Sequence, residues 1–347
     1  MRVLVTGGAG YIGSHAVRAL RKAGHQPIVL DNLVYGHAEL VEQTLRVPLV
    51  VGQLGDRSLL DLVLAEHKIE AVLHFAAYAY VGESVQDPAR YYRNNLGDTL
   101  TLLEALLACG RERGMHIPIV FSSTCATYGV PQAIPITEDE PQAPINPYGR
   151  SKWMVEQLLN DFGRAYGLPS VIFRYFNAAG AHPDGDLGED HDPETHLIPR
   201  VLDVMGGRSP YLQIFGDDYP TEDGTCIRDY IHVCDLADAH VLGLERLVAL
   251  QANPQASFQP LVYNLGNGTG YSVQQVIETA KAVTGCGLLA HVAPRRDGDP
   301  AVLVASAEHA FNDLGWSPRY PDLKVIIEHA WRWHRLRHLG ASPGTVS

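Results

Sequence analysis

The first 23 residues strongly limit the fold that this chain can adopt. A short apolar run at 3–6 meets a glycine-rich stretch, Gly7 to Gly13, which fits the pattern GxGxxG from Gly8, and a helical pattern (Tyr11–Ala23) follows at once. Glycines at such a turn let the backbone approach a phosphate, and the N-terminus of the helix presents free N–H groups to it. This order of strand, glycine turn and helix is typical of a dinucleotide-binding unit.

The rest of the first half alternates apolar runs with helical patterns. The expected further strands are 27–31, 47–51, 71–76, 117–124 and 170–176, and the expected further helices are 57–67, 89–107 and 147–166. The strand segments are apolar throughout, as in parallel strands that are covered on both faces. The sequence therefore predicts an α/β fold with a Rossmann-type doubly wound parallel sheet.

The pattern changes after Asn177. Glycine, proline and aspartate crowd 180–194 and 216–224, and the remaining pattern predicts fewer and shorter helices. We expect a smaller C-terminal α/β lobe that binds substrate. The expected domains are a dinucleotide-binding domain at 1–176 with returning segments from about 225–265, a mainly substrate-binding lobe at 177–338, and a flexible tail at 339–347.

Composition excludes several classes of function. The 347 residues carry a formal net charge of -12, which disfavours nucleic acid or an anionic membrane as a partner. The five cysteines are scattered and form no CxxC pair, so we expect neither disulfides nor a metal site. No apolar run is long enough to span a membrane, and no signal peptide is recognisable. We therefore expect a soluble cytoplasmic protein.

The end of the second expected strand indicates which dinucleotide binds. Asp31 follows Gly13 by 18 positions, and Asn32 comes next where an arginine would favour a 2′-phosphate. A carboxylate at this place accepts hydrogen bonds from a ribose 2′-hydroxyl and repels a 2′-phosphate. The sequence therefore favours NAD over NADP as the cofactor.

A second signal points to a catalytic base. Asn146 and Pro147 suit the N-cap and first position of a helix, so Tyr148 and Lys152 lie four residues apart on one helix face. An ammonium near a phenol stabilises the phenolate and lowers its pKa from about 10. Such a phenolate is a competent base for a sugar or alcohol hydroxyl. Thr124, at the end of the fifth expected strand, can offer its hydroxyl to the same substrate oxygen.

Longer stretches resemble one known family. The combination of Gly7–Gly13, Tyr148 and Lys152 resembles the extended short-chain dehydrogenases/reductases, and seven stretches resemble its NAD-dependent sugar-nucleotide 4-epimerases. These stretches are 1–15, 81–85, 174–177, 217–225, 228–232, 263–266 and 294–299. The resemblance runs from residue 1 to about 335. It implies an isomerase that interconverts the 4-epimers of a UDP-sugar, such as UDP-galactose and UDP-glucose, through a transient 4-keto sugar, with bound NAD holding the hydride and Tyr148 as general base.

The resemblance also implies roles for individual residues. Catalysis would fall to Tyr148, Lys152 and Thr124. The implied NAD-binding residues are Gly7, Gly10, Tyr11, Ile12, Gly13, Asp31, Asn32, Gln53, Leu54, Phe75, Ala76, Asn94, Ser122, Tyr148, Lys152 and Tyr175. The implied UDP-sugar-binding residues are Thr124, Asn177, His196, Leu197, Phe215, Arg228, Tyr230, Arg296 and Leu303.

Some positions differ from the family pattern. Ala79 stands where a lysine often lies beside the cofactor, Gln53 replaces an aspartate that contacts adenine, and His196 replaces an asparagine on the substrate side. Leu303 lies near the position that limits sugar size and is intermediate between the large and small residues known there. Acceptance of N-acetylated sugars therefore stays open. Stretches 75–80, 123–128 and 145–148 also resemble UDP-arabinose/UDP-xylose 4-epimerases, so a pentose substrate stays open too.

Two other functions compete with this interpretation. A sugar-nucleotide dehydratase needs an acid and a base after the threonine, whereas Cys125 and Ala126 follow Thr124 here. A catalytically silent NAD-binding regulator would have a broken tyrosine–lysine pair, and both residues are present. The family further implies a homodimer joined through a four-helix bundle. Its apolar surface would come from Leu100, Leu103, Leu106, Leu107, Trp153, Val155, Leu158 and Leu159, which could equally face the core.

Overall fold

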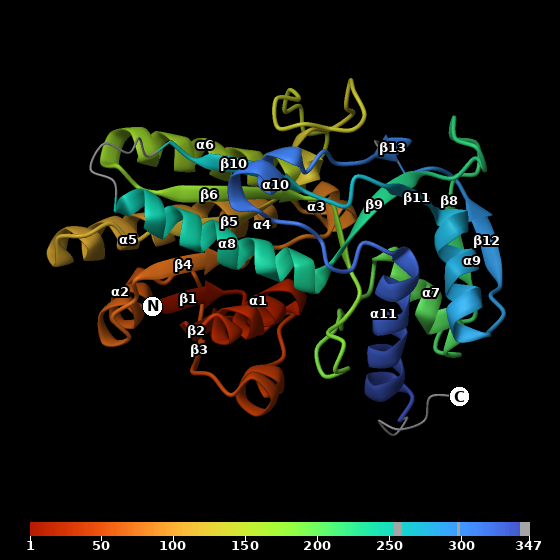
Figure 1. Cartoon of the computed structure of the whole chain (residues 1–347), viewed down its shortest axis with the longest axis horizontal. Helices are drawn as coiled ribbons and strands as arrows, with labels where there is room; N and C mark the ends of the chain where they lie inside the picture. The colour runs from red at the N-terminus through yellow and green to blue at the C-terminus, as the bar shows by residue number, and fades with distance from the viewer. Residues whose placement is uncertain (253–258, 297–298, 341–347) are drawn as a thin grey trace.

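The larger lobe is built on one parallel sheet. The computed structural model describes residues 1–252, 259–296 and 299–340, and within these ranges the sheet has seven strands in the order β10-β6-β5-β4-β1-β2-β3 (Figure 1). All neighbouring strands in it are parallel. The strands are β1 (Arg2–Thr6), β2 (Gln26–Asp31), β3 (Leu49–Val51), β4 (Ala71–His74), β5 (Ile119–Thr124), β6 (Ser170–Tyr175) and β10 (Leu261–Leu265). The predicted doubly wound α/β fold is confirmed.

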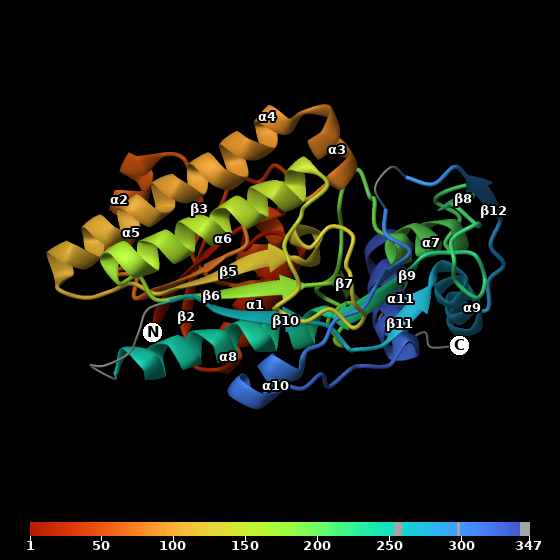
Figure 2. The same cartoon turned by 90° about the horizontal axis from the view of Figure 1, so that it is seen from above.

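Helices cover both faces of this sheet (Figure 2). One face carries α1 (Tyr11–Lys22) and α8 (Val233–Gln251), and the other carries α2 (Arg57–Glu66), α5 (Thr99–Arg113) and α6 (Pro147–Tyr166). Two separate apolar cores result, one on each face. Because both faces are buried, the strands need apolar residues at successive positions, which is the pattern that the sequence shows.

One predicted helix is longer than expected. The segment predicted at 89–107 consists of α4 (Pro88–Tyr91), a π-helical stretch η2 (Tyr92–Asp98) and α5, and these follow one another directly. The apolar pattern stops near Leu107, but the helix continues over polar residues until Gly114, whose positive φ of 63° ends it. A short helix α3 (Val81–Gln86) precedes this run.

The expectation of shorter helices after Asn177 is wrong. Among the described residues α8 has 19 residues and α11 (Leu323–His338) has 16. Shorter helices are α7 (Leu197–Met205), α9 (Val273–Thr284) and α10 (Glu308–Leu314). The stretches 180–194 and 216–224, which are rich in glycine, proline and aspartate, lie between β7 and α7 and between β8 and β9. They therefore do not limit the lengths of the helices.

The smaller lobe has its own sheets and core. A four-stranded sheet has the order β11-β9-β13 with β7 beside β9, and β12 pairs with β8. The strands are β7 (Asn177–Ala179), β8 (Leu212–Phe215), β9 (Ile227–His232), β11 (Gly270–Ser272), β12 (Ala290–Ala293) and β13 (Val302–Leu303). Helices α7, α9 and α11 share a third apolar core with these strands. Figure 1 shows this lobe beside the carboxyl ends of the main strands.

The chain crosses between the lobes more than once. After β9 in the smaller lobe, α8 packs against α1, and β10 pairs with β6 at the edge of the main sheet. Helix α10 then packs on α8 and β10. The expected tail lies outside the described residues from 341 onwards. Within the described ranges, no helix is long and apolar enough to cross a membrane.

Candidate active site

The glycine turn between β1 and α1 is closely packed. A Cβ atom at Gly7, which has a φ of +72°, would lie 2.7 Å from the backbone nitrogen of Ala76, and one at Gly13 would lie 2.2 Å from the carbonyl oxygen of Gly7. Gly10 is the N-cap of α1 and supplies no side-chain hydrogen bond to its first turn. The first turn of α1 thus has no side-chain cap and lies against a backbone without side chains, which suits a pyrophosphate placed at the N-terminus of α1.

Asp31 lies at the end of β2 and points into this turn. Its Oδ2 atom accepts a hydrogen bond from the N–H of Ala9 (3.0 Å), and Oδ1 accepts one from the N–H of Leu33 (2.9 Å). Burial raises the pKa of the Asp31 carboxyl group, while these N–H groups oppose the rise. Each carboxylate oxygen has a second lone pair, so Asp31 remains able to accept hydrogen bonds from a ribose.

Other predicted cofactor residues lie around the same strand ends. Asn32 Nδ2 donates to Gln53 Oε1 (3.2 Å), and Leu54 is buried next to it in sequence. Phe75 and Ala76 follow β4 directly, and both backbone N–H groups donate to the carbonyl oxygen of Thr6. In η2, Asn94 donates to the neighbouring side chain of Asn95 (2.9 Å). Phe75 and Ala76 thus lie at the point between β1 and β4 where the strand order reverses, the usual ligand position of such sheets, and Asn32 and Gln53 follow β2 and β3 to one side of it.

The tyrosine–lysine pair is buried at the start of α6. Asn146 Oδ1 accepts a hydrogen bond from the N–H of Gly149 (2.8 Å), which fixes the N-terminus of this helix. Lys152 is 4% exposed, and its Nζ atom donates to the carbonyl oxygen of Ser122 (2.7 Å). Burial lowers the pKa of Lys152 to about 7. The amine is thus directed at the end of β5, beside the residues that follow Ser122.

The expected pKa shift of Tyr148 is wrong for the protein without ligands. Burial raises the pKa of this phenol, and a hydrogen bond with Thr124 opposes the rise only in part. The Lys152 amine, which was expected to lower this pKa, donates to the carbonyl oxygen of Ser122. The hydrogen bond with Tyr148 places the side chain of Thr124 at the phenol, which agrees with the expectation from the sequence.

Ser122 and Tyr175 form a second polar pair at these strand ends. Ser122 Oγ donates to the hydroxyl oxygen of Tyr175 (3.1 Å), and burial raises the pKa of Tyr175 to about 12. The Nε2 atom of His240 lies 3.3 Å from the same Ser122 Oγ, and burial lowers the pKa of His240 to about 4. This neutral histidine was not predicted from the sequence, because it lies on α8, more than a hundred positions away.

Four of the nine predicted substrate residues lie on neighbouring strands of the smaller lobe. In the registers of β7, β9 and β13, Asn177 pairs with Tyr230, and Leu303 pairs with Arg228. Leu303 packs with Cys125 in a small apolar cluster, which places it beside the end of β5. This arrangement joins the predicted substrate side to the residues around Thr124.

Two arginines of the smaller lobe have different environments. Arg228 is 9% exposed and forms an ion pair with Asp299, a partner that was not predicted. The guanidinium carbon of Arg296 lies 4.1 Å from the centroid of the Phe215 ring. The two predicted residues Phe215 and Arg296 are therefore in contact, and a planar base could stack against such a surface.

His196 and Leu197 lie at the start of α7. The Nδ1 atom of His196 is 2.8 Å from Glu189 Oε1 and 3.0 Å from Glu194 Oε1. Burial lowers the pKa of His196, but these carboxylates outweigh that effect and raise it to about 10. Since Nδ1 faces the carboxylates, Nε2 is the atom that His196 can offer to a substrate.

A buried ion pair between Arg174 of β6 and Glu156 of α6 holds this helix against the sheet. Arg174 Nη2 donates to Glu156 Oε2 (2.7 Å), and Glu156 also accepts a hydrogen bond from Ser123. Glu156 follows Tyr148 and Lys152 at the next helical repeat of four, so its position on the same face could have been read from the sequence. The pair connects α6 to β5 and β6, the two strands whose ends carry the site.

Comparison with known proteins agrees with this geometry. Residues 3–266 match the model of the NAD dependent epimerase/dehydratase family. The chain belongs to this family. Its members use NAD, which fits the amide-lined turn and Asp31 described above.

Several UDP-glucose 4-epimerases resemble the chain along nearly its whole length. A UDP-glucose 4-epimerase of Halalkalibacterium halodurans is 52% identical over 335 residues, which cover 96% of each chain. Another, from Rhizobium meliloti, is 50% identical over 338 residues, covering 97% of this chain and 98% of the relative.

Solved structures of the family show the same fold. The UDP-glucose 4-epimerase of Brucella ovis in complex with NAD has a TM-score of 0.88 at 48% identity, covering 95% of this chain and 97% of that one. The enzyme of Stenotrophomonas maltophila, with bound NAD and formylated UDP-arabinopyranose, has a TM-score of 0.90 at 40% identity, covering 98% of this chain and 100% of that one.

Proposed function

We infer that the chain is an isomerase that interconverts the 4-epimers of a UDP-sugar, with UDP-galactose and UDP-glucose as its substrate pair. The single observation that carries this inference is the buried pair of Tyr148 and Thr124 beside Lys152, at the strand ends of an NAD-type fold. The identity of about half of all residues with UDP-glucose 4-epimerases supports the same reaction.

Tyr148 is the general base in this proposal. It removes the proton from the sugar 4-hydroxyl as a ketone forms at C4, and it returns this proton once the sugar has presented its other face. When bound, NAD would accept the hydride from C4 and return it, and its positive charge would favour the phenolate of Tyr148. Thr124 hydrogen-bonds to the reacting oxygen, and Lys152, fixed by Ser122, adds positive potential beside it.

Specificity for a UDP-sugar rests on the smaller lobe. Arg228 and Arg296 bind the diphosphate, since guanidinium groups pair with phosphate oxygens even on an acidic protein, and Phe215 stacks on the uracil. Asn177, His196, Leu197, Tyr230 and Leu303 complete this side of the site. The NAD side consists of the strand-end residues described above, from Gly7 to Tyr175.

A UDP-pentose is a second candidate substrate. Leu303 is buried against Cys125 and is of intermediate size, so it does not decide how large a sugar the site accepts. The Stenotrophomonas maltophila structure, which holds a formylated UDP-arabinopyranose, shows that a close structural relative accommodates a pentose derivative. A dehydratase is disfavoured, because buried Cys125 and Ala126 follow Thr124 and offer no carboxylic acid.

The cellular setting is part of the same proposal. We propose that the protein is cytoplasmic and that two copies pair through α5 and α6. Leu103, Leu106, Val155 and Leu159 belong to the core of one chain, which corrects their use as interface residues. Leu100 remains 36% exposed, and Leu107, Trp153 and Leu158 are partly exposed, so these four residues supply the apolar surface for the pairing.

One assay tests the reaction and ranks the substrates. Purified protein is incubated with UDP-galactose, UDP-glucose, UDP-arabinose and UDP-N-acetylglucosamine, without and with added NAD, and the products are separated by chromatography. We expect interconversion of UDP-galactose and UDP-glucose. Conversion of the pentose alone would move the assignment to a UDP-pentose 4-epimerase, and no conversion in either condition would refute the epimerase.

A further inference from the structure

Two histidines and two glutamates converge in the connection that leads into α7. Glu189, His191, Glu194 and His196 each offer one ligand atom, and these atoms all lie within 4.8 Å of one another. The exposed fractions of the side chains are only 6% for Glu189 and 12% for Glu194. The cluster lies close to Tyr11 at the start of α1, with 6.3 Å between the centroids of Tyr11 and His191.

The spacing of the four groups fits a tetrahedral ligand set. His191 Nδ1 lies 3.2 Å from Glu189 Oε1 and 3.6 Å from Glu194 Oε2. His196 Nδ1 lies 2.8 Å and 3.0 Å from the same two carboxylates. Around a zinc ion with bonds of about 2.0–2.1 Å, tetrahedral ligand atoms are about 3.3 Å apart. The four histidine–glutamate distances, which involve one oxygen of Glu189 and both oxygens of Glu194, bracket the length that a shared ion requires.

Hydrogen bonds alone satisfy the cluster poorly. Each Nδ1 atom carries at most one proton, yet each faces two carboxylates. His191 Nδ1 is buried and has no hydrogen-bond partner, although Glu189 Oε1 is only 3.2 Å away. Within the described ranges, the ion pairs of Glu189 involve histidines and neither lysine nor arginine. A positive charge at the centre would serve all four groups at once.

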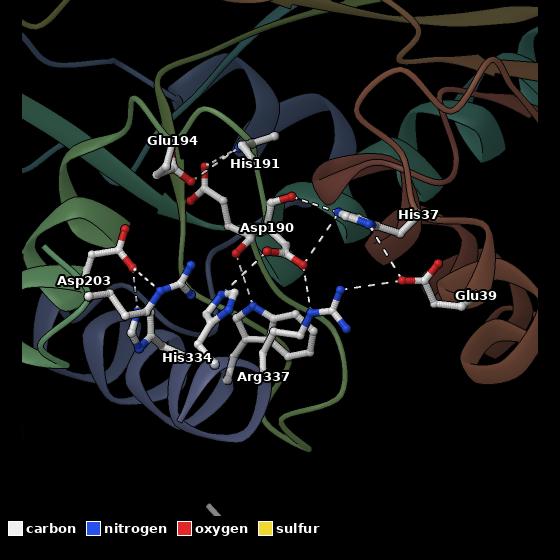
Figure 3. A network of polar contacts seen from close by, with 12 residues as sticks. His37, Glu39, Asp190, His191, Glu194, Asp203, His334 and Arg337 are labelled. Carbon is white, nitrogen blue, oxygen red and sulfur yellow. Dashed lines mark hydrogen bonds and ion pairs between the residues drawn. The ribbon is translucent and has the colours of Figure 1, made fainter. Parts of the chain in front are cut away.

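The backbone of the cluster is held on both sides. Glu194 Oε1 accepts hydrogen bonds from the N–H groups of Thr195 (2.6 Å) and His196 (2.7 Å), which orient this carboxylate. Asp190 receives Arg337 Nε of α11 (2.8 Å), and its carbonyl oxygen lies 2.9 Å from His37 Nε2 (Figure 3). Figure 3 shows Glu194 beside His191 at one end of this network. The ligand-bearing segment is therefore fixed before any ion binds.

We propose that Glu189, His191, Glu194 and His196 form a structural site for one zinc-type divalent cation. Binding of the ion releases the proton of each ligating imidazole nitrogen, so two carboxylates and two neutral imidazoles then carry two negative charges, which a dication balances. Oxygen and nitrogen ligands of this kind suit zinc. Four protein ligands complete a tetrahedral shell and leave no position for a reacting molecule. The ion thus adds to the contacts that hold the segment of His196 and Leu197 near Tyr11 at the start of α1. We expected no metal site because the cysteines form no CxxC pair. The proposed site has no cysteine ligand, so that pattern could not predict it.

Zinc binding tests this site without any measurement of turnover. Tag-free protein that has been treated with a chelator is dialysed against low micromolar Zn²⁺, and bound zinc is determined by mass spectrometry. We expect about one zinc ion per chain, and a melting temperature that rises by at least about 3 °C when free zinc is in hundredfold excess over Kd. No bound zinc would overturn the proposal and leave two imidazolium–carboxylate pairs as the account of the cluster.

Variants decide where the ion binds. H191A removes one ligand. E194Q removes the negative charge but keeps an oxygen that can accept the two backbone N–H groups, so a loss of zinc in E194Q would not be due to misfolding. Each should weaken zinc binding at least about tenfold and remove the rise in melting temperature. The matched control H291A alters an exposed histidine of β12 and should bind zinc as the parent does. Equal zinc binding by E194Q and the parent would refute the site.

Discussion

At the scale of the residue, the buried polar groups around Tyr148 form hydrogen bonds within the protein. Tyr148 meets Thr124, Lys152 donates to Ser122, and Ser122 in turn donates to Tyr175. Burial of this set raises the pKa of each phenol and lowers that of the amine, so all three groups are neutral more often than in water. The protein alone therefore holds its base protonated, and the bound cofactor and substrate must provide the charge that activates it.

Replacement of the base separates chemistry from cofactor binding. Y148F removes the proton acceptor but keeps the ring, so turnover of UDP-galactose should fall by about 10²- to 10⁴-fold while bound NAD is unchanged. Turnover is measured by chromatography, and NAD is measured after its release by denaturation. The control Y166F alters an exposed tyrosine at the other end of α6 and should keep full activity. Full activity of Y148F would refute its role as base.

The lowered pKa of Lys152 predicts a dependence of stability on pH. The pKa of Lys152 is about 7 in the folded protein and has its ordinary value of 10.5 in an unfolded chain, so between these values the unfolded state binds more protons. The contribution of Lys152 to the free energy of unfolding should therefore rise with pH across this window, by up to about 1.4 kcal/mol per pH unit. K152M keeps the apolar stem and removes this titration.

Urea unfolding of both proteins at pH 7, 8 and 9 checks this prediction. The free energy of unfolding of the parent, minus that of K152M, should increase with each step in pH. The subtraction cancels the other titrating groups that the two proteins share. A constant difference would mean that Lys152 stays protonated in the fold throughout this range.

At the scale of the element, the packing between β1, α1 and the end of β4 leaves no space for a side chain at Gly13. A Cβ atom there would meet the carbonyl oxygen of Gly7 at 2.2 Å, and this oxygen is backbone that also accepts the N–H of Gly10. The start of α1 would have to move away from β1. The backbone amides that we propose to bind the pyrophosphate would move with it.

G13A should therefore lose bound NAD and lower the free energy of unfolding by about 2 kcal/mol or more, within the range of overpacked sites. NAD content and urea unfolding are the measurements. G82A is the matched control, since Gly82 lies in the helix α3 with no atom within 4 Å of a Cβ. It should keep NAD and gain up to about 1 kcal/mol from helix propensity. Retention of NAD by G13A would contradict the assigned role of the turn.

At the scale of the whole molecule, the sequence predicts parts of the site that depend on short separations. Gly7–Gly13 lie in one turn, and Tyr148 and Lys152 lie four residues apart on one helix, so spacing alone places them. By contrast, Asp299 beside Arg228 and His240 beside Ser122 are long-range pairs, and no local period encodes them. The predicted end of the helix at 107 is wrong because the apolar pattern stops there, whereas α5 continues to Arg113 before Gly114. Residue roles at the site remain predictions that the variants above address.

The two lobes provide a last prediction, because the proposed substrate contacts both. Thr124 and Tyr148 belong to the larger lobe, whereas Arg228 lies on β9 and Arg296 on the segment after β12. A ligand that bridges the lobes stabilises the folded state by mass action, by about 2.7 kcal/mol when its concentration is a hundredfold above Kd. UDP should therefore raise the melting temperature of the NAD-loaded protein.

R228M should lose most of this rise. Removal of a charge-assisted contact weakens UDP binding by about 1.5–3 kcal/mol, and the comparison with and without UDP cancels any effect of the unpaired Asp299 on the fold itself. R295M is the control, since Arg295 lies next to Arg296 in sequence but pairs with exposed Asp218 and should keep the full rise. Thermal melts of the three proteins, with NAD content measured in parallel, give the result. An equal rise in R228M and the parent would place the diphosphate away from β9.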